Sequence, residues 1–163
     1  MDHNEKPDIE KLISENLNDI GYLDLENRKL GDDGAIRLSS LQIVSQVTTL
    51  ILGDNEISNK GVAALCESPY LSQVRALNLK SNKITAEGAK FIAQSSNWSN
   101  LDQLVLKFNE IGEEGAIYLS KSETLSKTST LDLFRNHIGT EGARAIKAST
   151  SLKNLNLNRS RLD

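Results

Sequence analysis

Residues 104–119 read LVLKFNEIGEEGAIYL and contain the pattern that decides the fold. The pattern has two leucines separated by one residue, then an asparagine, an isoleucine and a glycine: Leu104, Leu106, Asn109, Ile111 and Gly115. It returns every 27 residues, at Leu50, Leu52, Asn55, Ile57 and Gly61, at Leu77, Leu79, Asn82, Ile84 and Gly88, and at Leu131, Leu133, Asn136, Ile138 and Gly142. A fixed period of this length indicates a repeat protein, in which each unit buries its apolar side chains against its neighbours.

Each unit is predicted to contain a strand, a turn and a helix. The alternation Leu-x-Leu is typical of a short strand with two buried side chains. Acidic residues in the first turn, such as Glu113, and an apolar stripe, such as Ala116 with Leu119, indicate the helix. The asparagine amide offers two donors and an acceptor, so it is predicted to bond backbone groups of the turn and of the next coil. This predicted ladder consists of Asn55, Asn82, Asn109 and Asn136.

The regular order of these elements predicts an α/β solenoid shaped like a horseshoe. Strands that return through helices run parallel, with the helices on one side of the sheet. Packed helices lie about 8–10 Å apart and paired strands about 4.8 Å apart. The stack must therefore curve, with the parallel sheet on the concave face and the helices on the convex face. About six repeats are predicted over residues 20–163, starting near residues 20, 47, 74, 101, 128 and 152.

The N-terminal residues 1–19 are predicted to form a helical cap. Pro7 and Asp8 are suitable residues for a helix start. An apolar stripe at helical spacing follows them, made of Ile9, Leu12, Ile13, Leu17 and Ile20. Such an amphipathic helix would cover the exposed face of the first repeat.

The sixth unit departs from the regular pattern. Its Leu155 follows Leu131 by only 24 residues, and Ser160 stands in the place of the asparagine, as Arg28 does in the first unit. A strand is predicted through Leu155 and Leu157, and no closing helix follows it. Two alternatives stay open: this strand is the cap, or the natural chain continues past Asp163.

The repeated pattern closely resembles that of the leucine-rich repeat family, and within it the subclass of the ribonuclease inhibitor. The resemblance covers residues 20–163, although the period of 27 residues is shorter than the about 28 or 29 usual in that subclass. It implies binding of a protein partner through the concave sheet, often as an inhibitor or sensor. Similar small repeat proteins occur among secreted effectors of intracellular bacteria, so the resemblance is also compatible with a bacterial effector.

Composition and charge restrict the classes of partner and the compartment that can be expected for this protein. The 163 residues carry a net charge of −3, so a general attraction to nucleic acid or anionic membranes is not expected. No apolar run approaches the roughly 20 residues of a membrane span, and the start lacks a signal peptide. Cys66 is the single cysteine, which fits a reducing compartment. A cytoplasmic monomer is expected, or a protein exported into a host cytosol if it is an effector.

The sequence predicts no catalytic residue, no metal site and no cofactor. Its two histidines are His3, near the terminus, and His137, at an exposed position of a turn. Cys66 lies in a column of small helix residues and is interpreted as a packing residue rather than a nucleophile. Neither metal-ligand spacing nor a phosphate-binding loop is found. An enzyme is therefore not expected.

The strand positions between the buried leucines are predicted to face the concave side. Their charge runs from acidic at the first unit, near Glu26, to basic near Lys80, Lys107 and the rim residues Arg135 and Arg159. Aromatic residues with arginines are common anchors of protein interfaces. Partner binding is predicted for Thr49, Ile51, Asn78, Lys80, Gln103, Val105, Lys107, Phe108, Asp132, Phe134, Arg135 and Asn156. The alternative is that isolated apolar residues on a surface carry no function. A convex stripe of Phe91 and Tyr118 is a competing surface, for which burial between helices is the simpler interpretation.

Three functions are compatible with this sequence. The first is a non-catalytic module that binds a protein, and in one form inhibits or occludes an enzyme, through its concave face. The second is activation of a GTPase, because one family with this repeat type does so. The third is a structural or recognition fragment of a longer receptor.

Overall fold

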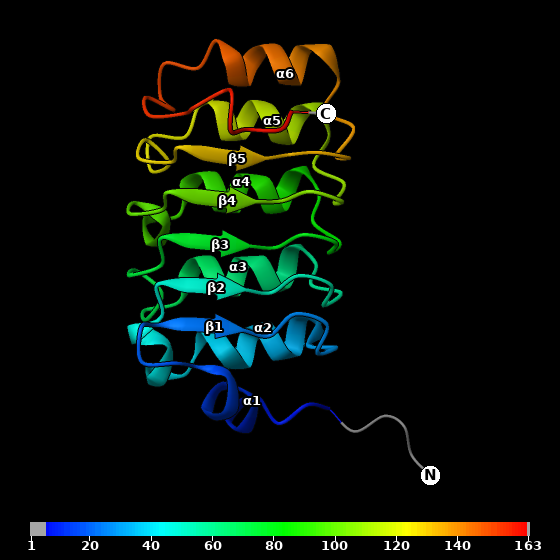
Figure 1. Cartoon of the computed structure of the whole chain (residues 1–163). Coiled ribbons are helices and arrows are strands. Elements are labelled where there is room, and N and C mark those ends of the chain that lie inside the picture. Colours follow the sequence, from blue (N-terminus) through cyan, green and yellow to red (C-terminus); the bar gives the residue numbers. More distant parts are fainter. Residues whose placement is uncertain (1–5, 163) are drawn as a thin grey trace.

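The computed structural model describes residues 6–162 and contains one parallel sheet with a layer of helices behind it (Figure 1). The strands pair in sequence order and are β1 (Tyr22–Asp24), β2 (Thr49–Ile51), β3 (Ala76–Asn78), β4 (Gln103–Val105) and β5 (Thr130–Asp132). The helices are α1 (Ile9–Asn16), α2 (Gly31–Ser39), α3 (Asn59–Glu67), α4 (Ala86–Gln94), α5 (Gly112–Ser120) and α6 (Gly139–Lys147). Two 3-10 helices, η1 (Gln42–Gln46) and η2 (Ser96–Trp98), lie in the returns from helix to strand. The predicted α/β solenoid is confirmed.

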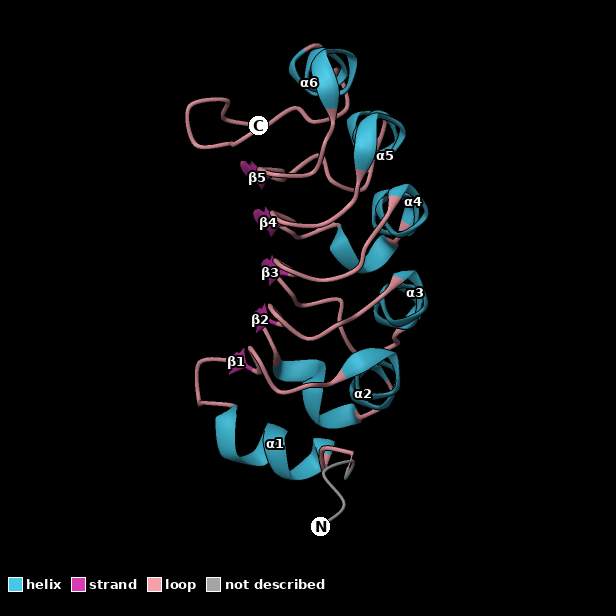
Figure 2. Ribbon diagram, turned by 90° about the vertical axis from the view of Figure 1, so that its right-hand side faces the viewer, coloured by secondary structure: helices cyan, strands magenta, loops and turns pink. Residues whose placement is uncertain are grey.

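The strands pair in the register that the 27-residue period predicts. Leu50 stands opposite Leu23 on one side and Leu77 on the other, and the remaining strands continue this row. The leucines of the row are at most 1% exposed, so they form the sheet side of a continuous core. The opposite face of the sheet is left free. Figure 2 shows the strands along the inner side of an arc and α2–α6 along its outer side, as the different widths of strands and helices require.

The asparagine ladder is present, but it bonds the preceding coil rather than the next one. Asn82 donates to Leu52 O, 30 residues earlier, at 3.0 Å, and accepts from Asn55 N at 3.2 Å and Ile57 N at 2.9 Å. Asn55 donates in the same way to Leu25 O at 2.7 Å. The prediction of bonds to the next coil was therefore wrong. The backward direction explains Arg28, because the first unit has no preceding coil to bond.

The N-terminal helix α1 covers one end of the solenoid. Asp8 caps it by accepting from Lys11 N at 3.1 Å, and Ile9 and Ile13 are buried. The helix ends at Asn16, however, and Ile20 is 78% exposed, so its predicted place in the apolar stripe was wrong. The cause is a turn in which the Asn18 side chain accepts from Ile20 N, which directs the isoleucine away from the core.

The strand predicted through Leu155 and Leu157 does not form. Leu157 is 46% exposed, and the asparagine-rich stretch 154–158 lies in turns, which these side chains favour. The predicted site residue Asn156 is thus not on the sheet, because its carbonyl accepts from Arg159 N at 3.0 Å within such a turn. The chain pairs with β5 at Arg161, whose N donates to Leu131 O at 3.0 Å and whose carbonyl accepts from Leu133 N at 2.6 Å, and Ser160 Oγ accepts from Leu131 N at 3.1 Å.

None of the helices in residues 6–162 is both long enough and apolar enough to span a membrane.

Candidate partner-binding surface

The free face of the sheet carries the predicted concave residues at least partly exposed. Gln103, Phe108 and Arg135 are exposed, and the others that the structure places on this face are partly exposed: Thr49, Ile51, Asn78, Lys80, Val105, Lys107, Asp132 and Phe134. Asn78 and Asp132 are partly committed to the fold, because their side-chain oxygens accept from the backbone N of Lys80 and Phe134. The two ends of this face differ in how their charges are paired.

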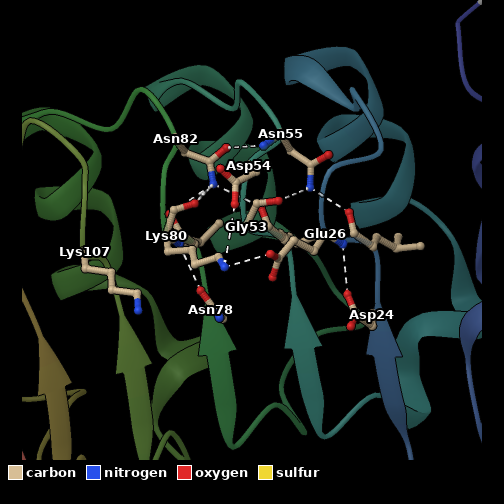
Figure 3. Close-up of polar contacts among 12 residues, drawn as sticks. Asp24, Glu26, Gly53, Asp54, Asn55, Asn78, Lys80, Asn82 and Lys107 are labelled. Atoms are coloured by element: carbon tan, nitrogen blue, oxygen red, sulfur yellow. Dashed lines mark hydrogen bonds and ion pairs between the residues drawn. The ribbon is translucent and has the colours of Figure 1, made fainter.

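At the end formed by β1–β3, the one lysine is paired with two carboxylates and the balance of charge is acidic. Lys80 reaches across β2 and places its Nζ 2.7 Å from Glu26 Oε1 and 3.7 Å from Asp54 Oδ2 (Figure 3). Gly53 makes this path available, because a Cβ there would lie 2.8 Å from Lys80 Cγ. The hydrogen bond with Glu26 raises the pKa of the Lys80 amine. The prediction that Lys80 belongs to a basic end of the surface is corrected, since its charge is already paired.

At the other end, two aromatic rings and several cations lie together. Phe108 and Phe134 make an edge-to-face contact, with ring centroids 5.7 Å apart and planes at 81°. The guanidinium of Arg135 lies 5.5 Å from the centroid of Phe134, and that of Arg161 lies 4.1 Å from it. Phe108 nevertheless remains 47% exposed. We call Lys107, Phe108, Phe134, Arg135 and Arg161 the C-terminal patch.

Phe108 and Arg135 hold a backbone conformation that costs free energy for such side chains. They have φ of 59° and 58°, in a column where the other units place Asn27, Asp54 and Ser81 at similar angles. Asparagine and aspartate visit this left-handed region readily, whereas bulky residues pay of the order of 1–2 kcal/mol. Strain of this kind concentrates at functional sites. The fold alone would favour an asparagine at position 108.

Arg161 was missed by the sequence analysis, which placed Arg159 at the rim instead. The error follows from counting the sixth unit as a regular strand, whereas turns bring Arg161 beside β5. The one available signal was the density of asparagine between positions 154 and 158, which favours turns over a strand.

The side chains that the sequence analysis considered for catalysis or metal binding do not form a common site among the described residues. His137 is exposed in a turn at φ 55°, and His3 lies outside the described residues. Residues 6–162 contain no group of three or more His, Cys, Asp or Glu side chains that could hold a metal ion. Phe91 and Tyr118 on the convex face are partly buried against the core, which agrees with the simpler interpretation of that stripe.

Cys66 is a packed thiol. Its Sγ accepts from Trp98 Nε1 at 3.4 Å. Burial raises its pKa from the ordinary 9.0 to about 11. Because the thiolate is the nucleophile, a pKa this high makes the folded thiol unreactive near neutral pH.

We therefore expect Cys66 to react with iodoacetamide at pH 8 on the order of a hundredfold more slowly in the folded protein than in urea, since thiolate falls tenfold per pKa unit. As pH rises, the Cys66 thiol keeps its proton to a higher pH in the folded state than in the unfolded state. The free energy of unfolding should thus fall, relative to a Cys66→Ser variant, as pH rises from 9 to about 11. Serine already occupies the equivalent position 120. Equal labelling rates in the folded and unfolded states would contradict this burial.

Comparison of the sequence with known repeat families identifies the family of this protein. The sequence pattern of the leucine-rich repeat matches residues 46–66, 72–93, 99–120 and 129–147, more than half of the chain. The chain belongs to the leucine-rich repeat family. No curated protein sequence matches it significantly. Leucine-rich repeat domains generally mediate protein–protein interactions and are typically non-catalytic. In this leucine-rich repeat protein the matched segments correspond to the units of β2–β5, which carry most of the free sheet face.

Proposed function

We propose that this leucine-rich repeat protein is a non-catalytic module that binds a protein partner on its concave face, centred on the C-terminal patch. The observation that supports this most is the edge-to-face pair of Phe108, which is exposed, and Phe134, which is partly exposed, at the ends of β4 and β5, with two guanidinium groups over the Phe134 ring. Aromatic and arginine side chains dominate the binding energy of protein interfaces. Rings that are held in place before binding lose little conformational freedom on binding.

The area of the sheet bears on how a partner would bind. Five strands at about 4.8 Å spacing span only about 20 Å, which is small beside the roughly 800 Å² that each partner buries in a standard interface. Contacts beyond the strands are thus required. Phe108 and Arg135 follow the ends of β4 and β5, so a partner centred on them covers the rim as well as the sheet.

We also propose the subclass of the repeat, the kind of partner and the location of the protein. A nine-residue helix after each strand supports placement in the ribonuclease-inhibitor-like subclass, because other repeats of the family use a 3-10 turn there. Occlusion of an enzyme partner by a cytosolic monomer is the form of binding that we propose. Activation of a GTPase, a receptor fragment and an exported effector stay hypotheses, since no feature of the described surface favours them.

The proposal predicts that the aromatic pair is needed for capture of a partner. Phe108→Asn and Phe134→Ala should each weaken binding of a captured protein about tenfold or more, as truncation of an interface anchor does. The Asn variant should leave the free energy of unfolding unchanged within about 0.5 kcal/mol or raise it, because asparagine suits the left-handed backbone that position 27 already shows.

The measurement is affinity capture from a lysate with quantitative mass spectrometry, followed by titration of the captured protein with each variant. Tyr22→Ala is the matched control, because Tyr22 is a 39% exposed aromatic residue on the same face at β1. A partner that both variants retain at full affinity would place the binding site elsewhere.

A further inference from the structure

We infer that the C-terminal patch recognises an acidic protein segment, in which carboxylates flank an apolar side chain. This inference rests on the proposed function and names the chemistry of its partner. It follows from which charges of the concave face are paired within the protein and which are not.

The cations of the patch are free to bind carboxylates. Among the residues that the structure describes, Lys107, Arg135 and Arg161 form no ion pair, whereas Lys80 is held by Glu26 at 2.7 Å. Figure 3 shows Lys107 standing apart from that cluster on the next strand. At the opposite end the single lysine is paired with Glu26 and Asp54, and Asp24 adds a further carboxylate, so the unpaired cations among the described strand and rim residues lie in the C-terminal patch. Asp132 is a carboxylate within the patch, and its Oδ1 accepts from Phe134 N at 3.1 Å.

The two arginines are oriented by the ring that they contact. Guanidinium groups 4.1 Å and 5.5 Å from the Phe134 centroid are positioned by cation–π attraction. Neither guanidinium has an ion-pair partner among the described residues, so its N–H donors remain available for bidentate bonds to carboxylates. Phe108, which is 47% exposed and contacts Phe134 edge to face, offers the apolar contact. A ligand that fits both parts carries acidic residues around an aliphatic or aromatic side chain.

The same geometry disfavours a long polyanion such as nucleic acid. Nucleic-acid surfaces align many cations, commonly 6–10 phosphate contacts. Here the free cations do not continue along the sheet, because Lys80 is paired and Lys83 Nζ lies 2.9 Å from Glu56 Oε2. The net charge of −3 also opposes a polyanion at long range. A short acidic segment is the ligand that matches a patch of this extent.

The test is selection of random linear peptides displayed on phage against the full chain at low salt. We expect the enriched peptides to carry net negative charge and at least one aliphatic or aromatic residue. Their affinity, measured by fluorescence anisotropy, should fall about tenfold or more in an Arg135→Gln, Arg161→Gln double variant, because charge-assisted hydrogen bonds are lost. It should also fall with added salt. Lys83→Gln is the matched control, because Lys83 is exposed and already paired with Glu56.

The outcomes separate this inference from the proposed function. Enriched peptides without an acidic bias that still require Phe134 would overturn the acidic partner and leave the concave-face site intact. Peptides that bind Phe108→Asn and Phe134→Ala as well as the parent protein would overturn both. No enrichment at all would overturn the acidic segment alone, because the capture experiment tests the proposed function separately. Tighter binding of oligothymidine than of the best acidic peptide would overturn the inference of an acidic protein partner in favour of nucleic acid. Lys107→Gln provides a second variant that leaves the C-terminal segment untouched, in case replacement of Arg161 disturbs the contact with β5.

Discussion

An Asn82→Ala variant should lose roughly 3–5 kcal/mol of the free energy of unfolding, because several buried backbone groups lose their partner together. Asn82 is 9% exposed. Its amide nitrogen donates to Leu52 O, Leu79 O and Lys80 O at 3.0–3.1 Å. Its oxygen accepts from two backbone N–H groups of the preceding coil. Each polar group left buried and unpaired costs about 1–3 kcal/mol.

Asn82→Asp should be comparably damaging at neutral pH, although it preserves the size of the side chain. It replaces the donating NH₂ by a carboxylate oxygen that faces the three carbonyls. This comparison separates the loss of hydrogen bonds from the loss of packing. In a solenoid the damage falls on the contact between neighbouring units, so it should also reduce cooperativity.

The measurement for both variants is urea denaturation followed by circular dichroism, with Asn78→Ala as the matched control. Asn78 lies on the same unit but is partly exposed, and its side chain accepts one bond, from Lys80 N at 3.0 Å. It should change the free energy of unfolding by no more than about 1 kcal/mol. Equal effects of the replacements at positions 78 and 82 would show that the ladder does not stabilise the solenoid.

Trp98→Ala should lose about 3–5 kcal/mol, as large buried residues do when truncated to alanine. Trp98 is 1% exposed and lies in the return from α4 to β4. Its column is otherwise filled by Val44, Leu71, Leu125 and Leu152, all at most 5% exposed. The ring therefore fills a space that smaller aliphatic residues fill in the other units, and its removal leaves a cavity beside Cys66.

Trp98→Leu is the matched control, because leucine already occupies three other units of this column, at positions 71, 125 and 152. We expect it to retain roughly half or more of the stability lost in the alanine variant, since the residual cavity is smaller. Thermal and urea unfolding would measure both. If leucine proved as damaging as alanine, the unit of α4 would require the indole itself rather than its volume.

Sequence and structure agree most closely where the repeat is strongest. The row of Leu23, Leu50 and Leu77 was predicted to be buried and is at most 1% exposed. Period and alternation suffice there, because a one-residue shift of any strand would expose both of its leucines. The predicted positions of the concave residues from β2 to β5 follow from the same rule.

The errors fall at the ends, where no neighbour repeats the pattern. Ile20 and Leu157 match the apolar spacing but are 78% and 46% exposed. Both follow or lie among turn-forming asparagines, whose local hydrogen bonds direct the chain away from the core. Single-sequence periodicity weighs each apolar residue alike, so it cannot detect that a local turn prevails over burial.

The sequence by itself determined the solenoid, its register, its curvature and which side chains of β2–β5 line the free face, because these depend only on a period and an alternation. The tertiary structure alone decided how the charges on that face are paired. Lys80 crosses Gly53 to reach Glu26, two strands away, and Arg161 returns to stack on Phe134. Such contacts depend on the reach of long side chains across neighbouring coils and on an irregular C-terminal turn, and neither leaves a periodic mark in the sequence.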